Sequence, residues 1–192
     1  PVIHVEAGLR SFNKAMPEEL NRIACDHMSS LLFSPTKAGM DNLKKEGFDL
    51  TPTKKASIDR PNVYHCGDVM YDNSLFFSEL SEEKSTVLAQ NELTKNQFIL
   101  CTIHRDTNTD QAKNLHAIFS ALLRIQKESN LDIILPIHPR TKKKMEELLS
   151  ADIQAQMTAS NRFKIIPPAG FLDIISLEKN ARMIITDSGG LD

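Results

Sequence analysis

Tryptophan is absent from this sequence, and cysteine occurs only three times in 192 residues. The three cysteines, Cys25, Cys66 and Cys101, lie far apart, and no two of them form a C-x-x-C pair. Neither a disulfide framework nor a cysteine-based metal site is therefore indicated. This usage is typical of a reducing compartment, so we expect a cytoplasmic protein in which each thiol is a small core residue.

A strong charge of either sign is also lacking. The 23 basic and 25 acidic residues leave a net charge of −2, which gives no long-range field to attract nucleic acid or an anionic membrane. The lysine run 142–144 has no aromatic neighbours and is expected to be a solvated helix face. No apolar run is long enough to cross a bilayer. We therefore expect neither nucleic acid nor a membrane as a partner.

Metal-binding patterns are missing as well. The six histidines include no H-x-x-x-H or H-E-x-x-H spacing, so no metal site is expected. The chain begins inside a predicted strand without a methionine and stops two residues after a glycine pair. We expect a fragment, the middle of a longer protein.

Short apolar runs alternate with helical patterns along the chain, which indicates an α/β fold with parallel sheets covered by helices. Strands are predicted at residues 2–5, 31–34, 63–66, 98–103, 133–137, 163–166 and 183–186. Helices are predicted at 17–28, 37–47, 115–125, 171–179 and in the lysine-rich segment that follows Pro139. Residues 68–95 carry helical patterns without a strand. The organisation is therefore two α/β blocks, 1–75 and 96–192, joined by a crossing at 76–95.

Ligands of open α/β sheets bind at the carboxyl ends of the strands, where this sequence places several polar clusters. In the first, Glu6 could act as a general base, Gly8 would allow a close turn and Arg10 could bind phosphate. An ordinary turn with a surface ion pair is the alternative. The next cluster places Glu18 and Glu19 in a first helical turn, where acids commonly complement the helix dipole. Neighbours on a helix point about 100° apart, so at most one of them can face a site shared with Glu6.

Two further clusters pair histidine with arginine. His104 could donate to a phosphate or act as a general acid, although a buried or capping histidine is an equal alternative. His138 and Arg140 flank a proline that opens a helix, whose amino terminus favours an anion.

The last cluster, Ser188-Gly189-Gly190, offers backbone N–H groups and a hydroxyl as a phosphate cradle, although a tight turn needs the same residues. The string Asp187-Ser188-Gly189-Gly190 also occurs in chymotrypsin-like proteases. Those are β-barrels, whereas this segment follows a parallel-type strand, so that interpretation is rejected.

Taken together, the clusters resemble the UDP-N-acetylglucosamine 2-epimerase family in identity, order and spacing. The matching strings, over nearly the whole chain, are HVEAGLR (4–10), PEELNR (17–22), HR (104–105), HPR (138–140) and DSGG (187–190). The resemblance implies two Rossmann-like lobes in the glycosyltransferase-B arrangement, both incomplete here. Residues 1–75 would be the C-terminal part of the first lobe, and residues 96–192 the N-terminal part of the UDP-binding lobe. It also implies a UDP-sugar substrate, no cofactor and a homodimer at full length.

The implied reaction removes the C2 proton, eliminates UDP from C1, reprotonates the other face and adds UDP back, feeding cell-surface polysaccharide synthesis. By the resemblance, Glu6 and Glu18 are the acid/base carboxylates and His104 assists UDP departure. The diphosphate cradle would be Ser188, Gly189 and Gly190. Further phosphate, sugar or uracil contacts would be Arg10, His138, Arg140 and Phe171.

Some features of the family are missing from this sequence. Its glycine-bearing first unit and a further catalytic aspartate would precede Pro1, and its ribose-binding acid would follow Asp192. The chain is therefore expected to be inactive alone. A hydrolysing epimerase, a glycosyltransferase of the same architecture and a non-catalytic sugar-nucleotide sensor remain alternatives. The epimerase interpretation predicts that Glu6, Glu18 and His104 converge on one interlobe cleft with Ser188 on its far wall.

Overall fold

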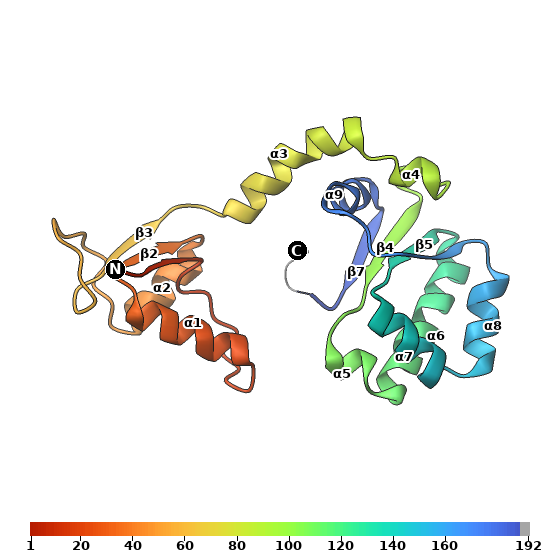
Figure 1. The fold of residues 1–192 in the computed structure, drawn as a ribbon, viewed down its shortest axis with the longest axis horizontal. Helices are drawn as coiled ribbons and strands as arrows, with labels where there is room; N and C mark the ends of the chain where they lie inside the picture. The colour runs from red at the N-terminus through yellow and green to blue at the C-terminus, as the bar shows by residue number, and fades with distance from the viewer. Residues whose placement is uncertain (189–192) are drawn as a thin grey trace. The chain divides into compact units, whose positions relative to one another are not determined.

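The computed structural model describes residues 1–188 and divides the chain into two compact units. We call Pro1–Asn73 unit 1 and Ser74–Asp192 unit 2. The boundary between the two units falls within a long helix, α3 (Val69–Lys84). Each unit is described by itself below (Figure 1).

Unit 1 is built on a parallel sheet with the order β1-β2-β3. Its strands are β1 (Ile3–Val5), β2 (Leu31–Ser34) and β3 (Asn62–His65), and its helices are α1 (Pro17–Met28) and α2 (Lys37–Lys45). Proline suits the first position of α1 because its fixed φ is helical and its missing N–H would be unsatisfied there. The Thr36 side chain caps α2 by accepting from the Gly39 N–H at 3.0 Å.

The core of unit 1 is small. Four buried side chains form it, namely Ala7, Leu32, Leu43 and Val63. Because Leu32 and Val63 lie opposite each other on β2 and β3, while Leu43 comes from α2, this core fixes α2 against the sheet. Ala7 belongs to the loop that leaves β1, so the same core holds that loop in place.

Unit 2 contains a four-stranded parallel sheet with the order β6-β5-β4-β7. The strands are β4 (Phe98–Thr102), β5 (Asp132–Pro136), β6 (Phe163–Ile166) and β7 (Met183–Thr186). The helices besides α3 are α4 (Val87–Gln90), α5 (Asp106–Thr109), α6 (Ala112–Ser129), α7 (Pro139–Leu148), α8 (Ala151–Ala159) and α9 (Phe171–Asn180). Pairing of β7 with β4 brings the last strand beside the first strand of the unit.

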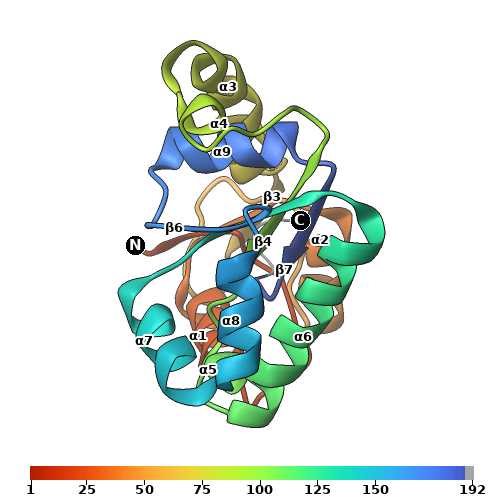
Figure 2. The ribbon, with the colours of Figure 1, turned by 90° about the vertical axis from the view of Figure 1, so that its right-hand side faces the viewer.

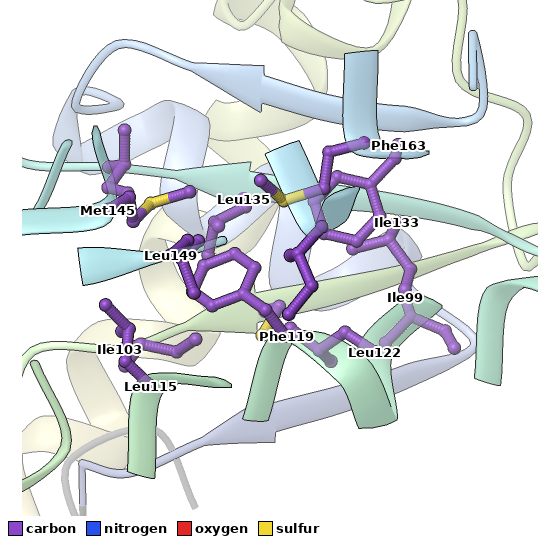
Figure 3. Packing of buried hydrophobic residues seen from close by; sticks show 14 residues of the cluster. Ile99, Ile103, Leu115, Phe119, Leu122, Ile133, Leu135, Met145, Leu149 and Phe163 are labelled. Carbon is purple, nitrogen blue, oxygen red and sulfur yellow. The ribbon is translucent and has the colours of Figure 1, made fainter. Parts of the chain in front are cut away.

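Helices cover both faces of this sheet, as Figure 2 shows. Alternate residues of β4 point to opposite faces, and all five are buried. Ile99 and Cys101 pack with α6, α7 and α8 in a cluster that includes Phe119 (Figure 3). Phe98 and Leu100 pack on the other face with Leu177 of α9 and residues of the α4 segment. This double layer gives unit 2 the larger core.

The predicted α/β class with parallel sheets is confirmed, and each predicted strand is present to within one residue at either end. Helix α1 has the predicted bounds. Two short helices, α5 and α8, were not predicted. For α8 a signal existed, because Ser150 caps it through Ile153 N–H. Among the described residues, no helix combines the length and apolar character needed to span a bilayer.

Candidate functional site

Glu6 stands directly after β1 in a left-handed backbone conformation, with φ of 71°, and its side chain is exposed. The next residue, Ala7, is buried and donates its N–H to Phe33 O at 3.0 Å. Gly8 follows with φ of 78°, and a Cβ there would lie 2.3 Å from Gly39 O. A non-glycine residue with positive φ carries strain, so surrounding contacts must hold Glu6 in this position.

Asp26 supplies those contacts. Its fully buried carboxylate accepts from His4 Nδ1 at 2.6 Å, from the Gly8 N–H at 3.1 Å and from Arg10 Nη2 at 2.7 Å. These partners lie on both sides of Glu6 in the sequence, so Asp26 fixes the whole turn. This residue was not among the predicted site residues. The sequence signal that could have identified it is its place in the last turn of a predicted helix. The helix dipole disfavours a negative charge there, so an acid at this position indicates a compensating partner.

The sequence predicts that Arg10 contacts a phosphate, but in the structure its guanidinium pairs with carboxylates of the protein. Its side chain is 1% exposed and also pairs with Glu46, through bonds of 2.8 Å from Nε and 2.6 Å from Nη2. The hydrogen bond with Glu46 raises the pKa of the guanidinium against the opposing effect of burial, and Asp26 adds to it. The observed role of Arg10 is therefore to brace the loop, and a phosphate contact stays a prediction.

Glu18 and Glu19 point in different directions, as their neighbouring positions on α1 require. Glu19 is 2% exposed, and its carboxylate accepts from Ser11 N–H at 2.8 Å, Ser11 Oγ at 3.0 Å and Phe12 N–H at 2.9 Å. The Ser11 backbone N–H is the main reason that the pKa of Glu19 lies below its usual value, and burial opposes the shift. Glu18 is exposed. Of the two, Glu18 is thus the one available to a ligand.

His104 follows β4 and is exposed, so it is not the buried histidine of the alternative interpretation. Its backbone N–H donates to Asp187 Oδ1 at 2.9 Å, and the Arg105 N–H and Asn108 Nδ2 donate to Oδ2 at 3.0 and 2.9 Å. Burial alone would raise the pKa of Asp187, but these bonds outweigh it and the pKa lies below its usual value. Asp187 therefore orders the loop that carries His104, a role that was not predicted from the sequence.

Ser188, from the predicted phosphate cradle, lies just beyond β7 and is half-buried. Its N–H donates to Thr186 Oγ1 at 2.9 Å, and that hydroxyl also contacts Thr102 Oγ1 at 2.8 Å. Gly189 and Gly190 lie outside the described residues, so the cradle stays a prediction.

His138 and Arg140 lie where β5 meets α7, and both are exposed. His138 is the N-cap of α7, with Nδ1 accepting from the Arg140 N–H at 3.3 Å. The Arg140 guanidinium donates to Asp106 at 2.6 Å and to Asp110 at 2.8 Å. The observed role of His138 is therefore to cap a helix, while its binding role and that of Arg140 stay predictions.

Phe171, predicted to lie against a uracil, opens α9 and is 60% exposed. Its ring meets Phe77 edge to face with centroids 5.0 Å apart. Exposure leaves the ring accessible to a flat ligand, and that contact stays a prediction.

Two cavities, of about 340 and 260 Å³, lie elsewhere in the described chain. The larger one is lined by α7, α8 and β6, including Met145, Met157 and Phe163. The smaller one lies in unit 1 and includes Glu46, the partner of Arg10. Neither is lined by a predicted site residue. Within residues 1–188, no group of three His, Cys, Asp or Glu side chains is placed to hold a metal ion.

All three catalytic candidates are thus exposed: Glu6 and His104 lie just after β1 and β4, and Glu18 lies in the first turn of α1. Glu6 and Glu18 belong to unit 1 and His104 to unit 2, so their convergence on one cleft stays a prediction. Unit 1 contributes the exposed carboxylates of Glu6 and Glu18, the first of them in a loop held by buried Asp26. Unit 2 contributes the exposed His104, which follows a strand.

Known proteins resemble the chain over its entire length. A family profile described as UDP-N-acetylglucosamine 2-epimerase matches residues 1–192. A UDP-N-acetylglucosamine 2-epimerase homolog of Methanococcus maripaludis is 41% identical over 191 residues, which are 99% of this chain and 48% of the relative. A UDP-2,3-diacetamido-2,3-dideoxy-D-glucuronate 2-epimerase of Pseudomonas aeruginosa is 40% identical over 192 residues, covering 100% of this chain and 48% of that protein.

Solved structures agree with these relatives. The chain superposes on Methanocaldococcus jannaschii UDP-GlcNAc 2-epimerase in complex with UDP-GlcNAc and UDP, with a TM-score of 0.79 and 37% identity. The match covers 99% of this chain and 49% of that one. The chain thus spans about half the length of the relatives it matches. With the motifs, the parallel sheets and a full-length profile match in agreement, the chain belongs to the UDP-N-acetylglucosamine 2-epimerase family.

Proposed function

We propose that the protein containing this chain interconverts UDP-N-acetylglucosamine and UDP-N-acetylmannosamine by epimerisation at C2. The observation that carries the proposal is Glu6, an exposed carboxylate held at positive φ by a loop anchored on buried Asp26. Strain of this kind persists where the surroundings enforce it and is concentrated at functional sites. Membership of the epimerase family supports the assignment of Glu6 as an acid/base carboxylate.

The C2 hydrogen of the substrate is not activated by a carbonyl group, so its removal needs a positioned base. In the proposed reaction, Glu6 and Glu18 act on opposite faces of C2, one removing the proton and the other returning one. UDP leaves C1 as the C2 proton is lost, giving a 2-acetamidoglucal intermediate, and adds back after reprotonation. His104 would stabilise the negative charge that develops on the departing diphosphate.

The remaining predicted contacts fit the same proposal. Ser188, Gly189 and Gly190 would cradle the diphosphate, with His138 and Arg140 as further anion contacts. Phe171 would pack against the uracil. We further propose that the full-length protein is a cytoplasmic homodimer that needs no cofactor and supplies a sugar nucleotide for polysaccharide synthesis.

A second candidate substrate has a specific observation in its favour. The P. aeruginosa relative is named for a 2,3-diacetamido uronate. Its identity to this chain, 40%, equals that of the Methanococcus and Methanocaldococcus relatives named for UDP-N-acetylglucosamine, at 38–41%, and exceeds that of the Bacillus subtilis relative with the same name, at 30%. Both sugars carry a 2-acetamido group and would epimerise at the same carbon. The proposed chemistry is therefore common to both, and only the sugar differs.

Proton NMR of each sugar nucleotide in D₂O with the full-length protein tests the proposal. Deuterium entering at C2 with UDP retained is expected, and the sugar that exchanges identifies the substrate. Free UDP with N-acetylmannosamine would instead indicate a hydrolysing enzyme, and no exchange with either nucleotide would refute the proposal.

Variants then test the assigned roles. Glu6→Gln and Glu18→Gln are each expected to reduce kcat by at least about 100-fold, because proton transfer by a positioned group contributes about 10²–10⁴-fold. Glu79→Gln, which changes an exposed acid of α3, is the matched control and should keep full activity. Full activity in Glu6→Gln would remove that residue from the mechanism.

A further inference from the structure

Phe12 combines two features that are unfavourable in a folded protein. Its side chain is 79% exposed, the highest value among the large apolar residues of the described chain. Its backbone has φ of 56°, in the left-handed region that a bulky residue enters at a cost. Glycine or asparagine would occupy this position without that strain. The conformation is therefore imposed by other groups.

Glu19 imposes it. The Glu19 carboxylate accepts from the Phe12 N–H at 2.9 Å, and from the Ser11 N–H and hydroxyl at 2.8 and 3.0 Å. Only 2% of Glu19 is exposed, so an ionised carboxylate there depends on these three donors. The contact orders the backbone on which Phe12 stands, while leaving its ring in solvent.

The same helix also locates Phe12 relative to the candidate catalytic acids. Asp26 holds Gly8 and Arg10, and Glu19 lies seven residues earlier on α1. Seven residues correspond to about 10 Å of helix, so the loop runs along α1 from the anchor near Glu6 toward the amino end. There Phe12 is bonded to Glu19, the chain neighbour of exposed Glu18.

We propose that Phe12 is a substrate-contacting residue whose ring packs against the 2-acetamido group of the sugar nucleotide, and that Glu19 is its positioning residue. This inference rests on the proposed function, in which Glu18 acts at the carbon that bears the acetamido group. An apolar methyl group gains free energy by leaving water against an aromatic face. Since both candidate substrates carry this group, the contact is independent of which one is used.

Binding measurements on the full-length protein separate this role from a structural one. Phe12→Ala is expected to weaken UDP-N-acetylglucosamine binding about five- to tenfold, as one lost aromatic contact does, and to leave the affinity for UDP unchanged. Ile58→Ala, which removes another exposed apolar side chain of unit 1, should change neither affinity. If UDP-N-acetylglucosamine binding proves weak, the diacetamido uronate nucleotide takes its place in the same comparison.

Glu19 is tested with Phe12 in a double-mutant cycle. Glu19→Ala should weaken binding of the same nucleotide and leave the affinity for UDP unchanged. The double variant should bind no more weakly than the more affected single variant, because both substitutions remove the same contact with the substrate. Fully additive losses would show that Glu19 does not act through Phe12.

Stability gives an independent readout. Phe12→Gly relieves the left-handed strain, so its melting temperature should equal or exceed that of the unaltered protein while substrate binding falls. A clear drop in melting temperature would mean that the ring packs within the full-length protein, which would overturn the inference. Equal binding of the nucleotide by Phe12→Ala and the unaltered protein would also overturn it, with the proposed function intact. An unaltered protein that binds neither candidate nucleotide would refute both.

Discussion

Arg10 and Asp26 form an ion pair with Nη2 2.7 Å from Oδ2, and at most 1% of either side chain is exposed. The pair joins the loop after β1 to the last turn of α1, and Glu46 extends it to the end of α2. Three segments that are distant in the sequence are thereby held around the strained turn that carries Glu6. The stability of unit 1 and the position of its candidate catalytic acid should therefore depend on the same contacts.

Asp26→Asn is expected to lower the free energy of unfolding by about 2–4 kcal/mol. Removing one partner of a buried pair commonly costs about 3–5 kcal/mol, and Glu46 still compensates part of the Arg10 charge. Chemical denaturation of the full-length protein measures the change. Asp41→Asn alters an exposed acid of α2 and should stay within about 0.5 kcal/mol of the unaltered protein. Equal effects of the two substitutions would contradict the anchoring role.

Gly8→Ala should be more damaging than an alanine at another left-handed glycine. The new Cβ would lie 2.3 Å from Gly39 O, and φ of 78° adds strain, so we expect a loss of at least about 3 kcal/mol. Gly47 has φ of 94°, and a Cβ there would meet no atom within 4 Å, so Gly47→Ala isolates the strain at about 1–2 kcal/mol. Thermal unfolding of both variants tests the difference, and similar melting temperatures would show that the loop moves aside freely.

Glu19 should make stability depend on pH in acid. Its pKa in the folded protein lies below the ordinary value of 4.5, because the Ser11 N–H donates to the charged form. The unfolded chain therefore takes up a proton first as pH falls, so the stabilisation is complete above about pH 4.5 and is lost through the lower folded pKa. Glu19→Gln, which does not titrate, should reduce stability near neutrality and flatten the acid limb of the curve. Parallel curves for the two proteins between about pH 3 and pH 7 would disprove this linkage.

Asp187→Asn should impair catalysis more than substrate binding. The amide keeps one acceptor oxygen for the N–H groups of His104 and Arg105 and loses the negative charge that orders them. We expect kcat to fall about tenfold with little change in KM, since misplacing a catalytic group costs rate more than affinity. Asp152→Asn, at an exposed position of α8, is the control. A rise in KM at constant kcat would assign Asp187 to substrate binding instead.

Much of the fold could be predicted because local chemistry and tertiary packing agree. Pro17 and the acids of the first turn mark the start of α1, and the continuous apolar run of β4 indicates a strand covered on both faces. By contrast, α8 presents only Ile153 and Met157 to the core, and this apolar stripe is too short to predict a helix; the capping residue Ser150 is the one local signal for it.

The candidate site could be predicted only in part. Motif order and spacing single out Glu6 and His104, which follow strands, and the Glu18–Glu19 pair, which lies in a first helical turn, and their catalytic roles stay predictions. Motif spacing does not identify Asp26 or Asp187 as anchors, since their partners lie up to 83 residues away along the chain.

The sequence by itself determined the order of strands and helices, the α/β class and the family motifs, all of which depend on neighbours within a few turns or one strand. The tertiary structure decided which acid is exposed and which is buried, that Arg10 pairs with Asp26, and that β7 lies beside β4. These relationships follow from long-range packing, where a buried charge must find its partner wherever the fold brings one.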